Sequence, residues 1–185
     1  MIRLENFTEN DFDQLIEWVN SDHLMTNWAG SLFSFPLNEE SLNWYIRETN
    51  DLQKSDALVY KAIDDKSGET VGHISLGSIS RKNRSGRISR VLVGQNAHRG
   101  KGICCSMVSA ILTIAFEELS LHRVALGVYD FNKSAIGCYT KCGFTEEGRM
   151  RDVLLYNNEY WTLVEMGILE DEWFTKNPNS IKKSA

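Results

Sequence analysis

The chain has 185 residues, of which 42% are hydrophobic and 24% charged, the balance of an ordinary folded globular protein. Its net charge of −5 argues against the phosphate backbone of a nucleic acid as the main partner. We therefore expect no nucleic-acid partner, and the short basic run at residues 81–87 fits a solvated loop between strands.

No signal for export or membrane insertion is visible in the chain. The amino terminus lacks a basic stretch followed by an apolar run. The most apolar stretch, residues 103–116, is shorter than the roughly 20 residues that span a bilayer, so it predicts a buried helix. These features predict a cytoplasmic protein with no membrane partner.

The four cysteines are Cys104, Cys105, Cys138 and Cys142, and none forms a CxxC pair. The adjacent pair would face two directions on a helix, which argues against a four-ligand zinc site. Cys138 and Cys142 share a helical face and could in principle bind a metal. We nevertheless expect reduced, packed thiols and no metal.

The pattern of apolar and turn-forming residues predicts strands and helices along the whole chain. A capping box at Thr8 and Asp11 starts the first helix, and Gly143 is expected to end the last one. The expected strands are 2–7, 57–64, 71–78, 87–93, 123–129, 144–155 and 160–169. The first expected helix ends at residue 18, and the others cover 38–50, 103–118 and 133–142. This order predicts a mixed α/β class, with one domain at residues 1–173 and a polar tail at 174–185.

A glycine-rich turn follows the strand expected at residues 87–93. It reads Arg99-Gly100-Lys101-Gly102 and opens the apolar helix. The first N–H groups of a helix lack intrahelical partners, and the helix dipole adds partial positive charge there. Glycine lets a pyrophosphate approach the backbone closely. The turn therefore predicts a site for a phosphorylated ligand, although a plain surface turn could use the same residues.

Two common phosphate-binding motifs do not fit this turn. A Walker A loop needs Ser or Thr after the lysine, where Gly102 stands. The dinucleotide motif GxGxxG would need glycine at position 105, which is cysteine. The turn therefore matches neither the Walker A motif nor the dinucleotide motif.

Two segments together resemble the signatures of the GNAT acetyltransferases. The first follows the coenzyme A motif [Q/R]-x-x-G-x-[G/A]. Arg99 and Gly102 match this motif, and Cys104 departs from it because the motif has Gly or Ala there. In the second, residues 130–144, the matching residues are Asn132, Tyr139, Gly143 and Phe144. The resemblance covers nearly the whole chain and looks closest to the branch that acetylates ribosomal-protein amino termini.

The resemblance implies a mostly antiparallel, twisted sheet of about seven strands, splayed at an acetyl-CoA site and flanked by about four helices. It also implies a homodimer. The residues that it assigns to the cofactor are Val91, Leu92 and Val93, through their backbone, then Arg99, Gly100, Lys101, Gly102, Ile103, Cys104, Asn132 and Ser134. For Val91 to Val93 a plain core strand, and for Asn132 a helix cap, are the structural alternatives.

Tyr139 is implied as the acid that protonates the departing thiolate. It lies seven residues after Asn132, so both face the same side of a helix. A thiol titrates near 8.5 and a phenol near 10, so modest tuning would permit this transfer. The alternative is an aromatic core residue.

The group that takes the proton from the attacking amine is not evident. The strand glutamate that often does so in related enzymes aligns with Arg87. The other candidates are Glu146, Glu147, Asp130, His73 or a chain of water molecules.

A site without a strong base suits an α-amine, with a pKa near 8, better than a lysine side chain near 10.4. We therefore expect a peptide amino terminus as acceptor. A small-molecule amine (an amino sugar, antibiotic or polyamine) and a non-catalytic acyl-CoA-binding regulator remain alternatives. The aromatic residues Trp28, Phe33, Phe35 and Trp44 lie in the segment that often borders the acceptor, where we expect no acidic cluster.

Overall fold

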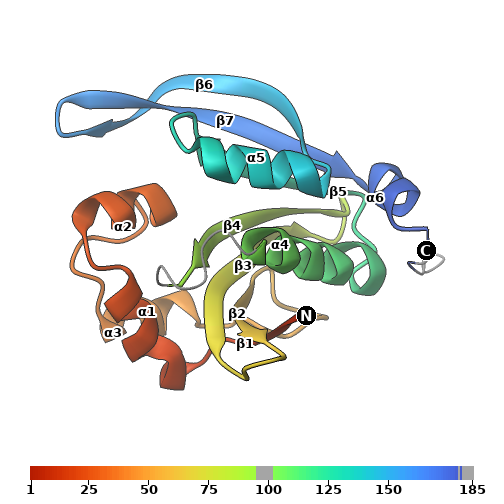
Figure 1. Ribbon diagram of the computed structural model, residues 1–185, viewed down its shortest axis with the longest axis horizontal. Helices are drawn as coiled ribbons and strands as arrows, with labels where there is room; N and C mark the ends of the chain where they lie inside the picture. The colour runs from red at the N-terminus through yellow and green to blue at the C-terminus, as the bar shows by residue number, and fades with distance from the viewer. Residues whose placement is uncertain (95–101, 179, 181–185) are drawn as a thin grey trace.

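The computed structural model describes residues 1–94, 102–178 and 180. Its centre is one seven-stranded sheet in the order β1-β2-β3-β4-β5-β7-β6, in which only β4 and β5 pair in parallel (Figure 1). The strands are β1 (Ile2–Asn6), β2 (Leu58–Asp64), β3 (Thr70–Ser80), β4 (Ser85–Val93), β5 (Arg123–Tyr129), β6 (Thr145–Tyr156) and β7 (Glu159–Leu169). The expected sheet is therefore confirmed.

Six α-helices are present among the described residues, compared with the four expected. They are α1 (Phe12–Trp18), α2 (Asp22–Ala29), α3 (Glu39–Tyr45), α4 (Ile103–Thr113), α5 (Lys133–Cys142) and α6 (Glu170–Lys176). The prediction omitted α2 and α6, and it extended the helix that begins after Asn38 by several residues. No helix in the described part of the chain is long and apolar enough to cross a membrane.

Local sequence signals account for several element ends. Thr8 and Asp11 form the expected capping box, and the side chain of Asn38 accepts a hydrogen bond from the Ser41 N–H at 2.9 Å. At the β6–β7 turn, Asn157 and Asn158 adopt φ values of 46° and 63°, as a two-residue hairpin turn requires. The two caps set where their helices begin, and the turn sets the register between β6 and β7.

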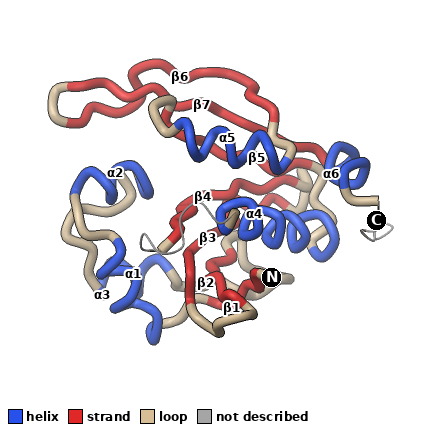
Figure 2. Tube along the Cα trace, in the orientation of Figure 1, coloured by secondary structure: helices blue, strands red, loops and turns tan. Residues whose placement is uncertain are grey.

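The sheet carries a separate hydrophobic core on each face. Successive residues of a strand point to opposite faces, so Leu58 packs in the core under α4 and α5, whereas Val59 packs in the core under α1 to α3. Figure 2 shows α4 and α5 lying together over the sheet, and α1 to α3 gathered apart from them at the left of the view. The two helix groups thus border the sheet from different sides.

A bulge in β4 changes which face its side chains occupy. His73 pairs with Leu92 and Ser75 with Ser89, so β4 contains one more residue than β3 in this interval. Arg90 within the bulge has a φ of 52°. Because of the extra residue, Ile88 and Leu92 belong to opposite cores although they are four positions apart.

The two parallel strands separate just before the bulge. Pairing between β4 and β5 runs from Ser85 with Arg123 to Ile88 with Leu126 and ends there. Residues 89–93 of β4 and 127–129 of β5 have no ladder between them. This is the splay that the family resemblance implied.

Candidate active site

A pocket of about 1000 Å³ opens where β4 and β5 diverge. Its walls come from these two strands, from α2, from the first turn of α4 and from α5. The pocket is thus built from segments of both halves of the chain, and its size suits an extended ligand.

Most residues assigned from sequence to the cofactor or, in the case of Tyr139, to catalysis meet in this pocket. They are Val91, Leu92, Val93, Gly102, Ile103, Cys104, Asn132, Ser134 and Tyr139. The remaining three, Arg99, Gly100 and Lys101, lie outside the described residues. The pocket brings the predicted residues together, while their individual roles stay predictions.

The amino terminus of α4 opens on this pocket through Gly102. This residue caps the helix with φ 76° and ψ 9°, a left-handed conformation that favours glycine. Apart from its chain neighbours, no described residue has an atom within 4 Å of the position that a Cβ would occupy there. Lys133 and Lys141 also line the pocket. Exposed helix N–H groups together with two ammonium groups suit a polyphosphate.

Asn132 begins α5 as a helix cap. Its side-chain oxygen accepts hydrogen bonds from the Ala135 N–H at 3.2 Å and from the Ser134 hydroxyl at 3.1 Å. The capping alternative is therefore confirmed. The Nδ2 group of the same side chain would be the part that donates to a pantetheine carbonyl.

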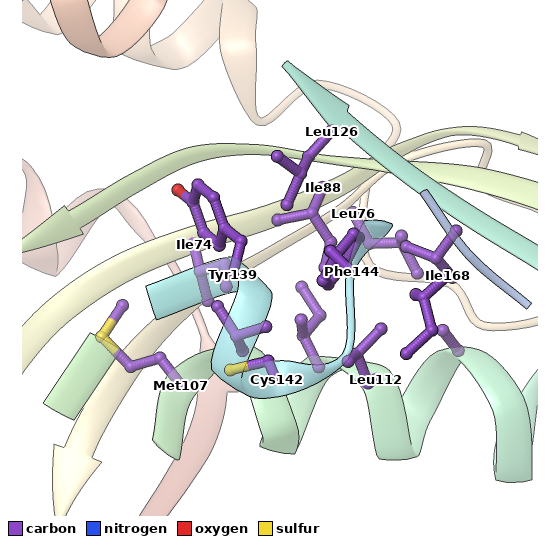
Figure 3. Packing of buried hydrophobic residues seen from close by; sticks show 14 of the residues in the cluster. Ile74, Leu76, Ile88, Met107, Leu112, Leu126, Tyr139, Cys142, Phe144 and Ile168 are labelled. Atoms are coloured by element: carbon purple, nitrogen blue, oxygen red, sulfur yellow. The ribbon is translucent and has the colours of Figure 1, made fainter. Parts of the chain in front are cut away.

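Tyr139 lies deep in the pocket wall. Its ring packs edge-on against Phe144 at 6.1 Å between centroids. Figure 3 shows its hydroxyl pointing away from α4. Burial, followed by the nearby Cys142, raises the pKa of Tyr139, so the phenol remains protonated at neutral pH. The hydroxyl therefore carries a proton, but burial makes it a weaker acid than a free phenol, which is opposite to the tuning that transfer to a thiolate would need.

Arg87 occupies the strand position of the missing glutamate and forms an ion pair. Its guanidinium donates two hydrogen bonds to Glu165, at 2.8 and 2.7 Å. A Cβ on Gly127 would lie 2.6 Å from Arg87 Nη2, so the absence of a side chain at 127 makes room for this pair. Arg87 lines the pocket as a paired cation and offers no base.

None of the four candidate bases is among the described residues that line the pocket. Glu146 pairs with Arg149 and Glu147 with Arg123, and each arginine lowers the pKa of its partner carboxyl. The Asp130 N–H donates to the Thr162 carbonyl. The described lining contains no Asp or Glu at all.

His73 is buried beneath the β4 bulge rather than in the pocket. Its ring lies 4.7 Å from Phe7 and its Nε2 is 3.3 Å from the Tyr45 hydroxyl. Burial, and then the charge of Arg90, lowers the pKa of His73 to about 3. The ring is therefore neutral at physiological pH and serves the packing of this region.

Sequence reasoning did not find Arg90, and of the residues that α2 contributes it named only Trp28. Arg90 lines the pocket, and its guanidinium carbon lies 5.0 Å from the centroid of the Tyr45 ring. Residues of α2 that line the pocket include Leu24, Asn27 and Trp28. The positive φ at Arg90 has no signature in sequence, because arginine rarely adopts it.

The aromatic segment divides between packing and the pocket. Trp28 stacks on Phe33 at 5.8 Å between centroids, and both are buried. Trp28 also lines the pocket, whereas Phe35 and Trp44 are exposed and do not. Packing therefore explains most of this cluster.

The cysteines differ from the expectation of four reduced thiols. Cys104 and Cys138 form a disulfide between α4 and α5, while Cys105 and Cys142 are free. The prediction was wrong for the first pair because it treated each helix alone, and packing of the two helices brings residues 34 positions apart into contact.

Comparison with known proteins gives the family. Residues 2–145 match the model described as "Acetyltransferase (GNAT) domain". The chain is 25% identical over 159 residues to a spermidine N(1)-acetyltransferase of Vibrio cholerae, covering 85% of this chain and 87% of that one. It is 35% identical over 106 residues, 57% of each chain, to a putative ribosomal N-acetyltransferase, YdaF, of Bacillus subtilis.

A solved structure has the same fold. The spermidine N-acetyltransferase of Vibrio cholerae in complex with CoA and spermine superposes with a TM-score of 0.79 at 22% identity, covering 94% of this chain and 98% of that one. The chain therefore belongs to the GNAT acetyltransferase family. It is an N-acetyltransferase that uses acetyl-CoA as its acetyl donor.

Proposed function

We propose that the protein acetylates a primary amine of a small molecule, with polyamines as the first class to test. The observation that carries this proposal is the extent of the match to the spermidine acetyltransferase, which spans more than four-fifths of both chains. The match to the putative ribosomal N-acetyltransferase spans little more than half of each. This ranking reverses our expectation from sequence, which placed peptide amino termini first.

The charge distribution supports a cationic acceptor at long range. Residues 8–56, which include α1 to α3, contain ten Asp and Glu side chains and two Lys and Arg side chains. Such a region raises the local concentration of cations. No carboxylate is among the described lining residues, so a polyamine would be attracted by this field rather than held by a direct ion pair in the pocket.

The cations in the pocket would help to keep the reacting amine neutral. A nearby positive charge lowers the pKa of an ammonium group, and Arg90 and the paired Arg87 both line the pocket. An amine that binds there loses its proton more readily to water. This effect would replace part of the work of a dedicated base.

The proposed reaction is direct transfer. The backbone of Val91 to Val93, free of a partner strand on the β5 side, would hold the pantetheine amides, and the first turn of α4 would hold the pyrophosphate. The neutral amine attacks the thioester carbonyl, the carbon–sulfur bond breaks, and Tyr139 donates its proton to the leaving thiolate. The attacking nitrogen releases its proton to water, water returns a proton to Tyr139, and the products are an amide and free CoA.

A peptide α-amine is the second candidate. The pocket lining has no described carboxylate to bind a polycation, and an α-amine with a pKa near 8 is partly neutral at pH 7 without help. The higher local identity to the putative ribosomal N-acetyltransferase also favours it.

An acceptor panel distinguishes the two candidates. Release of free thiol from acetyl-CoA is measured with spermidine, spermine, an aminoglycoside and peptides with free amino termini. The proposal predicts a kcat/KM for at least one small amine about tenfold or more above that of any peptide, equivalent to about 1.4 kcal/mol in transition-state binding. A panel in which a peptide leads by this margin would reject the small-molecule proposal and support the second candidate.

A further inference from the structure

All four cysteines gather where α4 and α5 pack against each other. Cys104 is bonded to Cys138, and the Sγ atoms of Cys105 and Cys142 lie 2.8 Å apart. The sulfur atoms of Cys105, Cys138 and Cys142 all lie within 4.8 Å of one another. The cluster therefore places two free thiols beside a disulfide, at distances that allow thiol–disulfide exchange.

The cluster lies in the wall of the cofactor pocket. Cys104, Cys105 and Cys138 line it. Cys104 belongs to the first turn of α4, two residues after Gly102, and Cys138 directly precedes Tyr139. The disulfide thus connects the helix end expected to bind the pyrophosphate with the helix that carries the expected proton donor.

We propose that this cluster is a thiol-oxidation site, and that its disulfide strengthens the binding of CoA. Formation uses a low-molecular-weight disulfide as oxidant: the Cys104 and Cys138 thiols lose two protons and two electrons, and the oxidant becomes two free thiols. A thiolate of Cys105 can also attack Cys138 and release Cys104, which moves the bond without any external reagent.

Two physical effects give the direction of the change. The disulfide fixes the spacing of α4 and α5 before the ligand arrives, which reduces the ordering cost of binding. The disulfide also holds the sulfur of Cys104 against Cys138 of α5. Position 104 is where the family motif has only Gly or Ala. Reduction frees this larger side chain next to the helix end that would receive the pyrophosphate.

The test compares protein oxidised with glutathione disulfide with protein reduced with dithiothreitol. Mass mapping of non-reduced peptides, thermal melting without ligand, and calorimetric titration with CoA are measured for both states. We expect a Cys104–Cys138 peptide, a melting temperature several degrees higher in the oxidised state, and a Kd for CoA about 3- to 10-fold larger after reduction.

Variants at two positions of the cluster provide the controls. Cys138→Ala and Cys138→Ser should each abolish the difference between the two treatments, whereas Cys142→Ala should retain it.

Equal CoA affinities in a proven disulfide form and a proven dithiol form would overturn the proposal. Tight binding of Cd²⁺ by the reduced protein, with no Cys104–Cys138 peptide after oxidant treatment, would instead make the cluster a metal site and also overturn it. Mapping and melting need no cofactor, so they separate this failure from a general loss of CoA binding.

Discussion

At the level of single residues, the pocket combines a buried phenol with cationic side chains and, among its described lining residues, no carboxylate. This combination favours proton donation to a leaving group over proton removal from an attacking one. Tyr139 could be singled out from sequence because it matches the family's second signature, and its role as proton donor stays a prediction. Arg90 could not, because its position depends on a bulge that only pairing with β3 creates.

Replacement of Tyr139 by phenylalanine tests the proton donor. The ring and its packing on Phe144 are retained and only the hydroxyl is lost. We expect kcat to fall by about 100-fold or more, with the Kd for CoA within about twofold of the wild type. Steady-state thiol release and calorimetry measure the two quantities. Unchanged kcat would remove Tyr139 from the chemistry.

His73 predicts a specific dependence of stability on pH. Its folded-state pKa of about 3 lies below the ordinary value of 6.5, so the unfolded chain takes up the proton first as the pH falls. Stability should therefore decline from about pH 7 towards pH 3, with His73 contributing a loss of about 2 kcal/mol between pH 7 and 5. Urea denaturation of wild type and His73→Gln measures this contribution, and identical pH profiles for the two proteins would refute it.

Among the secondary-structure elements, β5 and α5 were predicted with their observed bounds. Their ends carry strong local signals: Asn132 caps the helix and Gly143 ends it in a left-handed conformation with φ 108°. The omitted helix α2 has its own cap at Ser21, but its sequence, DHLMTNWA, mixes polar and apolar residues without a long apolar face. The position of α2 depends on the packing of Met25 and Trp28 in the core under α1 to α3, which is a tertiary effect.

The glycine that ends α5 can be tested against a glycine inside the same helix. Gly143→Ala would strain a positive φ and place a Cβ 3.0 Å from Ile168 Cδ1, so we expect a loss of about 1–2 kcal/mol in stability. Gly137→Ala has open space and a helical backbone, and it should stabilise by about 0.5–1 kcal/mol. Chemical denaturation gives both values. Equal effects of the two changes would contradict the assigned role of Gly143.

For the whole molecule, sequence predicted the family, the sheet and a set of residues that meet in one pocket, because these depend on local patterns and motifs. The rest of the pocket could not be predicted in the same way. It is assembled from α2, from Arg90 in the bulge of β4 and from the end of β5, which are far apart in sequence. The disulfide was missed for the same reason, since Cys104 and Cys138 meet only through helix packing.

Binding of CoA tests the account most directly, because every assigned role assumes that the ligand lies between β4 and β5. Titration calorimetry on the wild type should show one site per chain with a Kd of about 1 µM to 1 mM. Gly102→Val, which strains the left-handed cap of α4, should weaken binding about tenfold or more. Absence of measurable binding by the wild type, or full affinity in Gly102→Val, would contradict the placement of the cofactor at the amino terminus of α4.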